Sequence, residues 1–200
     1  DALLQKDPKN SHLLYLRGRL ETYSSSACEY YDRSIAADPK NSNSYFAKAI
    51  DLAGRGELTA ARELCATACG LNPDSLRMKE IFYQLRFALG EYAALEKEAR
   101  SVLSLNALDW INFLRVLALR IAQKDNPGAQ KALEDFRAAL QKEATPDTAQ
   151  YELRSRLHLA YLQGDFDTMA RQGATLKEVA LREETLKEAY LNLAGRLEEE

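Results

Sequence analysis

The pentapeptide Asp-Pro-Lys-Asn-Ser occurs twice in this 200-residue chain, at residues 7–11 and 38–42, and Asn-Pro-Asp-Ser at residues 72–75 is a third version. Pro8, Pro39 and Pro73 are therefore 31 and 34 residues apart. A proline stops one helix because it lacks a backbone N–H, and the Asn or Ser that follows can cap the next. A turn that recurs at this period predicts a chain of stacked helical units.

The composition argues against non-specific nucleic-acid binding and against insertion into a membrane. The chain is 46% hydrophobic and 28% charged, and its net charge of -3 gives no overall basic field. We therefore expect no non-specific binding to nucleic acid. No apolar run approaches the roughly 18 residues that a membrane-spanning helix needs, so we expect no membrane insertion. No signal peptide opens the sequence.

The three cysteines, Cys28, Cys65 and Cys69, all fall in helical patterns. Cys65 and Cys69 are four residues apart and share a helix face, which is the arrangement of half a metal site or a redox pair. The two histidines are distant in sequence, and the spacing fits no zinc pattern. We expect buried, reduced thiols without a metal, which suits a cytoplasmic protein.

Residues 42–75 carry a helix-pair pattern in which large and small residues alternate at set positions. The residues that define it are Tyr45, Ala49, Leu52, Gly56, Ala61, Ala68 and Pro73. This pattern resembles the tetratricopeptide repeat family, whose 34-residue unit is two antiparallel helices. Small residues suit it because they let helices approach where a neighbour's large side chain must fit.

The resemblance implies an all-α, right-handed superhelical solenoid of about five repeats plus a C-terminal capping helix, in a single domain over residues 1–200. The expected repeats are residues 11–41, 42–75, 76–109, 110–145 and 146–181. Residues 1–6 are interpreted as the remnant of a preceding helix, so we expect a fragment or a processed form. Residues 182–200 carry a stripe of Leu186, Tyr190, Leu193 and Leu197 and are expected to cover the end of the stack.

Departures from the 34-residue period predict local features. The first repeat is three residues short near residues 24–26, which predicts a shortened first helix and a capping box of Ser26 with Glu29. Gly90 is expected to end a helix in the left-handed conformation. Later insertions place helix starts at Asn126-Pro127 and Thr145-Pro146, with each proline at the first helical position.

No catalytic constellation is present in the sequence. Gly54-Arg55-Gly56 lacks the third glycine and the preceding strand of a phosphate loop, and the carboxylates are mixed with Lys and Arg along helices. We expect no enzyme activity, no cofactor and no metal.

The family's ligand surface is its concave face, lined by set positions of each first helix, and the resemblance implies a peptide-binding groove there. The corresponding residues are His12, Tyr15, Arg19, Asn43, Phe46, Ile50, Arg77, Glu80, Gln84, Tyr151, Arg154 and His158. Phe46, Ile50 and Phe87 fit the core as well as the groove, and Ile111 and Leu114 fit the core better. The arginines also fit ordinary surface charges, and the histidines fit packing positions. The carboxylate clamp of chaperone-binding members is absent in every register.

We therefore expect a non-enzymatic protein-interaction module that binds a peptide or partner segment, acidic or amphipathic, in this groove; self-association is also open. The alternative is the repeat region of a larger enzyme or secretion assembly whose activity lies outside these residues.

Overall fold

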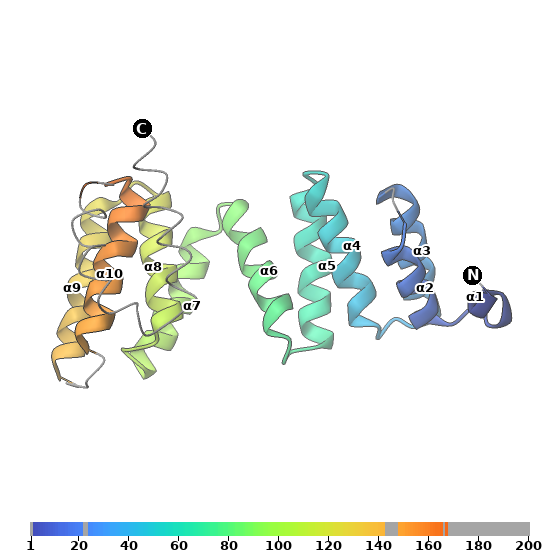
Figure 1. Cartoon of the computed structure of the whole chain (residues 1–200), viewed down its shortest axis with the longest axis horizontal. Coiled ribbons are helices and arrows are strands. Elements are labelled where there is room, and N and C mark those ends of the chain that lie inside the picture. The colour runs from blue at the N-terminus through green and yellow to red at the C-terminus, as the bar shows by residue number, and fades with distance from the viewer. Residues whose placement is uncertain (1, 22–23, 143–147, 166, 168–200) are drawn as a thin grey trace. The chain divides into compact units, whose positions relative to one another are not determined.

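A computed structural model describes residues 2–21, 24–142, 148–165 and 167 (Figure 1). Within these residues the regular structure is entirely helical, which confirms the all-α class. The helices are α1 (Ala2–Lys6), α2 (Ser11–Arg19), α3 (Ser24–Ala37), α4 (Ser42–Gly54), α5 (Leu58–Leu71), α6 (Leu76–Ala88), α7 (Tyr92–Leu105), α8 (Trp110–Ala122), α9 (Asn126–Lys142) and α10 (Thr148–Gln163). None of these helices is long and apolar enough to cross a membrane.

The chain divides into two compact units, residues 1–95 and 96–200. The single domain over residues 1–200, with its repeat boundaries, stays a prediction. Thr145-Pro146 and the expected capping helix at 182–200 lie outside the described residues.

In the first unit each helix packs on the next along the chain, from α2 through to α6. The core around α4, α5 and α6 has small residues at its centre. Ala49, Ala61 and Ala68 are fully buried there, and Cys65 lies among them without exposed surface. Short side chains at these points let α4 and α5 approach closely, as the repeat pattern predicts.

Gly18 of α2 serves the same purpose at the contact with α3. A Cβ atom at this position would lie 2.6 Å from Cε1 of Tyr31, whose side chain is buried. Glycine is therefore required by space here, because the ring of Tyr31 occupies the volume that any side chain would need.

The four-residue turns that join one helix pair to the next have one hydrogen-bond pattern. The amide of the first turn residue donates to a carbonyl four residues earlier, in the pairs Asp7 to Leu3, Asp38 to Ser34, Asn72 to Ala68 and Asn106 to Val102. Asn10 and Ser75 then cap the next helix, as predicted, by accepting from the amides of Leu13 and Met78. Asn41 makes no such cap, and its amide group donates to Oγ of Ser11 instead, at 2.8 Å.

A buried hydroxyl cluster fixes α2 and α4 against α3. Oγ of Ser34 donates to the carbonyl of Ser11 at 2.6 Å and lies 2.7 Å from Oγ of Ser44. Ser34 and Ser44 have no exposed surface, so these hydrogen bonds satisfy groups that water cannot reach. The cluster holds the first helices α2 and α4 on neighbouring sides of α3, and α2 also contacts α4.

The first helices α4, α6 and α8 are each followed by a residue in the left-handed conformation. Gly56 and Gly90 have φ of 81° and 76°, which confirms the prediction for Gly90. Lys124 occupies the same place after α8, with φ of 59°. In each case the residue after the left-handed one donates its amide to a carbonyl of the helix. The pairs are Glu57 to Leu52, Glu91 to Arg86 and Asp125 to Arg120. This pattern satisfies carbonyls at a helix C-terminus.

The predicted short first helix is confirmed, because α2 has 9 residues where α4 has 13. The predicted capping box is wrong: Ser26 lies inside the first turn of α3, which runs from Ser24. At α9 the predicted start is one residue late. Asp125 is the cap, since its carboxylate accepts from the amide of Gly128 at 2.9 Å, and Pro127 is the second helical residue.

The second unit has an aromatic core between α8, α9 and α10. The rings of Phe113 and Phe136 stack at 4.0 Å with an angle of 13° between their planes. Trp110 packs on both of these rings and on Tyr151. Leu117, Leu119 and Ala129 are fully buried in this unit.

Candidate functional site

The predicted groove residues of α2 lie on one helix face because they are three and four residues apart. The ring centroids of His12 and Tyr15 are 6.0 Å apart, and Nη1 of Arg19 donates to Oη of Tyr15 at 3.1 Å. His12 and Arg19 are exposed and Tyr15 is half-buried against Tyr31. The face therefore presents an aromatic pair with a cation at its end.

The three predicted residues of α4 have different environments. Asn43 is exposed, and 39% of Ile50 is exposed. Phe46 is only 8% exposed and belongs to the core with Ala49, Leu52 and Met78. The structure thus assigns Phe46 mainly to the core and leaves Ile50 on the surface.

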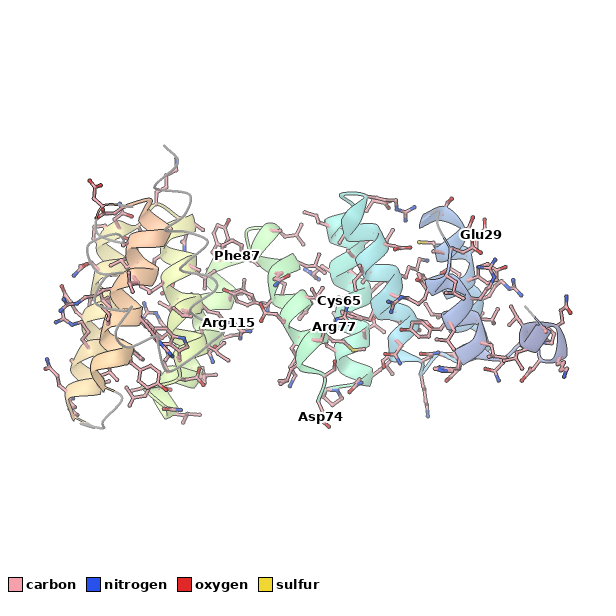
Figure 2. All side chains as sticks on the ribbon, in the orientation of Figure 1. Glu29, Cys65, Asp74, Arg77, Phe87 and Arg115 are labelled. Atoms are coloured by element: carbon pink, nitrogen blue, oxygen red, sulfur yellow. The ribbon has the colours of Figure 1, made fainter. Side chains whose placement is uncertain are left out.

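Arg77 connects α6 to this face. Its guanidinium carbon lies 5.7 Å from the centroid of the Phe46 ring, within the distance of a cation–π contact. Arg77 itself is exposed (Figure 2). The ring of Phe46 therefore supports a cation at the surface while its body fills the core.

Glu80 and Gln84 follow Arg77 at intervals of three and four residues on α6, and both are exposed. Nε2 of Gln84 donates to Oε1 of Glu80 at 3.3 Å. Phe87 is half-buried between Tyr83 and Tyr92, with ring centroids 6.3 and 5.2 Å away. Nine of the twelve predicted residues thus belong to the first unit, on the first helices α2, α4 and α6.

The remaining three belong to the second unit. Tyr151 is half-buried and packs on Trp110, with ring centroids 5.7 Å apart, so its ring contributes to the core. Arg154 is half-buried on α10. The side chain of His158 lies outside the described residues. That Arg19, Arg77 and Arg154 face one concavity stays a prediction.

Ile111 corrects the expectation of a core residue, because 62% of its side chain is exposed on α8. Leu114 is partly buried against the aromatic core, as expected. The difference arises because Ile111 falls on the face of α8 opposite the stacked rings of Phe113 and Phe136.

The cysteines are unpaired thiols in the described residues. Cys65 is fully buried and its Sγ donates to the carbonyl of Met78 at 3.6 Å. Burial raises the pKa of Cys65 to about 12. Cys28 is also buried, but Cys69 is only half-buried, so the prediction of a buried pair holds for one member.

Sequence reasoning missed two arginine clusters. The guanidinium carbons of Arg17 and Arg33 both lie near the ring of Tyr30, 5.1 and 5.3 Å from its centroid. Glu91 accepts from Arg62 and Arg86, and the hydrogen bond from Arg86 is the main reason that the pKa of Glu91 is lowered. Each cluster includes an arginine from another helix, Arg17 of α2 beside Tyr30 and Arg62 of α5 beside Glu91, so spacing along one helix does not reveal the whole cluster.

A pocket of about 260 Å³ in the second unit was also missed. Its walls come from α7 with the turn after it, α8 and α9, and they combine aromatic and aliphatic side chains with two charged groups. The lining residues are Arg100, Leu103, Ser104, Ala107, Phe113, Val116, Ala132, Asp135 and Phe136. Arg100 pairs with Glu96, and Asp135 pairs with Lys131.

No protein-family model and no curated protein sequence matches the chain. Solved structures do resemble it. A MamA fragment from Desulfovibrio magneticus RS-1 is 12% identical, over 87% of this chain and 95% of its own, with a TM-score of 0.53. YrrB, described as a tetratricopeptide repeat protein with an unusual peptide-binding site, is 10% identical over 86% of this chain and 96% of its own, with a TM-score of 0.52.

A third structure, of Naa15/Naa10 bound to HypK-THB, is 16% identical and covers 99% of this chain and 31% of its own, with a TM-score of 0.57. Identities this low show the fold alone. Together with the helix pairs and their recurring turns, these likenesses establish that the chain has a tetratricopeptide-repeat-like, helical-repeat fold.

Proposed function

We propose that the chain is a non-enzymatic protein-interaction module that binds a peptide segment of a partner across the exposed faces of α2, α4 and α6. The observation that carries the proposal is the exposed guanidinium of Arg77 held over Phe46, which is itself one helical turn from the exposed Ile50. Cation and apolar surface are thus presented side by side by neighbouring first helices.

The chemistry of this surface suits an acidic, amphipathic segment. A guanidinium carries five N–H donors in a planar fork, so Arg19 can hold Oη of Tyr15 and also bind a carboxylate. Tyr15 and Ile50 offer contact area for apolar side chains. We propose that carboxylates of the partner pair with Arg19 and Arg77 and that its apolar residues contact Ile50.

Fold likeness supports binding as the activity. YrrB is described as having a peptide-binding site, and Naa15 is described in a complex with HypK-THB. These ligands and partners belong to those proteins. For this chain we propose only the shared mode, in which a preformed helical surface receives a partner segment.

The test compares capture of partners by the 200-residue chain and by an Arg19→Glu, Arg77→Glu variant, using lysate of the natural source and mass spectrometry. We expect a protein captured reproducibly by the parent chain to be lost with the variant. The matched control is Arg33→Glu with Arg55→Glu, which makes the same charge change on α3 and in the loop after α4. Equal capture by all three folded proteins would contradict the proposal.

Three finer points stay predictions. Tyr151, Arg154 and His158 of the second unit are proposed to contact the partner as well, and an added Arg154→Glu should then weaken capture further. A cytoplasmic location is proposed from the three unpaired thiols, and a native protein in which these cysteines are disulfide-bonded would exclude it. Membership of a larger enzyme or secretion assembly is tested by the domains that the full gene encodes.

A further inference from the structure

The side of α2 that faces away from α3 is apolar and exposed. Leu13 is half-buried, Leu16 is 43% exposed, and Leu20, directly after the helix, is 78% exposed. Their spacing of three and four residues makes one continuous stripe. A repeat that ends a stack in water normally has a polar outer face. The outer face of α2 is apolar instead.

The equivalent side of each later first helix in this unit is covered by a second helix. The third residues of α4 and α6, Ser44 and Met78, are buried, although Leu13 at the same place in α2 is not. α3 covers α4 through Ala27 and Tyr31, which pack on Ala47. α5 covers α6 through the buried residues Ala61, Cys65 and Ala68, in one core with Met78 and Leu85.

α1 occupies the position of the last turn of such a covering helix. Four residues separate α1 from α2, as they separate α3 from α4 and α5 from α6. The amide of Asp7 donates to the carbonyl of Leu3 at 3.1 Å, as Asp38 does to Ser34 and Asn72 to Ala68. Leu3 therefore has the register of Ser34 and Ala68, yet it is 66% exposed.

We propose that Leu13, Leu16 and Leu20 form a docking face for an amphipathic second helix of this same protein that runs into α1. The covering helices α3 and α5 indicate its chemistry. Cys65 and Ala61 come three and seven residues before Ala68, which is equivalent to Leu3. We therefore expect small or aromatic residues three and seven positions before Leu3, on the side of the helix that contacts α2. The peptide-binding surface with Arg19, Ile50 and Arg77 is a different face, and that proposal does not depend on this one.

The turn geometry favours this occupant over a second copy of the chain. A helix that continues α1 backwards is directed along α2 by the same turn that directs α3 along α4 and α5 along α6. A second copy would have to reach the stripe beside α1 with a helix that already packs within its own unit. The docking face therefore continues a series of contacts that the chain makes twice more.

The direct test is thiol labelling at Leu16→Cys, read at that residue by mass spectrometry. The variant is made in the 200-residue chain and in the protein as its gene encodes it. We expect labelling at least about tenfold slower in the gene-encoded protein, because a packed helix must open locally before the thiol reacts. Thr67→Cys, on an exposed site of α5, is the control and should label equally in both.

Fast labelling at position 16 in both proteins would overturn the proposal, since the face would then be bare. Slow labelling in both proteins would also overturn it. A labelling rate that falls as the protein concentration rises would identify a second copy as the cover. A rate that is independent of concentration would identify a segment within the 200 residues.

A graft provides a second measurement. A copy of residues 57–65 joined ahead of Asp1 places copies of Ala61 and Cys65 in the covering register. This graft should slow labelling at position 16 and raise the melting temperature, and a graft with Glu at both copied positions should do neither. Equal results from the two grafts would show that the face does not accept such a helix.

Discussion

The guanidinium of Arg77 lies over the ring of Phe46, 5.7 Å from its centroid, and so links α6 to α4 across the first unit. The residues are 31 positions apart in sequence, and each comes from the first helix of a pair. The contact therefore reports the stacking of one pair on the next.

Substitution of Arg77 by Ala should lower the free energy of unfolding by about 0.5–1 kcal/mol, the usual size of an exposed cation–π contact. Urea denaturation of Arg77→Ala, Phe46→Leu and the double variant measures the coupling between the two residues. Arg77→Lys keeps the charge and should lose less than Arg77→Ala. A coupling energy of zero would show that the cation and ring do not interact in solution.

Substitution of Gly18 by Ala should destabilise the chain by about 1–3 kcal/mol, because the added methyl overpacks against Tyr31. Thermal or urea unfolding measures this change. Gly70→Ala in α5 is the matched control, since nothing lies within 4 Å of a Cβ there. That control should gain up to about 1 kcal/mol from helix propensity. Equal effects at both glycines would rule out the steric explanation.

Substitution of Lys124 by Gly should stabilise the chain by about 1 kcal/mol, since a non-glycine residue at φ of 59° has an unfavourable left-handed backbone. Gly90→Ala, at the same turn position with φ of 76°, should lose a similar amount. Both changes can be followed by the midpoint of urea unfolding. A destabilising Lys124→Gly would mean that the lysine side chain contributes more than the backbone strain costs.

Alkaline pH should destabilise the fold through Cys65. Its pKa is raised by burial from 9.0 to about 12, so above pH 9 the unfolded chain loses this proton while the folded chain retains it. Stability from this thiol is complete below pH 9 and falls as the pH rises towards 12. Between pH 8 and 10.5 the loss should be about 1–2 kcal/mol.

Urea unfolding at these two values of pH, for the parent chain and for Cys65→Ala, isolates the thiol. The alanine variant should lose less stability over this interval, although burial also raises the pKa values of Cys28, Cys69 and Tyr31. An identical pH dependence in both proteins would contradict the assignment to Cys65.

The helical units could be predicted from the residue pattern, because their signals are local. Pro39 and Pro73 lie in the turns that precede α4 and α6, and the small residues Ala49, Ala61 and Ala68 lie at the closest helix approaches. A missing N–H, a capping side chain and a glycine with positive φ act within a few residues of themselves. Where two local signals competed, as Asp125 and Asn126 did, the cap moved by one residue.

Which side chains of each first helix are available to a partner could not be predicted in this way, because it depends on packing between helices. Phe46 and Ile50 are one turn apart on α4, yet the first fills the core and the second is exposed. Leu16 is apolar like a core residue, yet it is exposed. In the described residues no helix covers this side of α2 in the way that α3 covers the equivalent side of α4. The reason is physical: exposure depends on which neighbouring helix covers a position, and that neighbour is set by packing between units rather than by the residue's own local sequence.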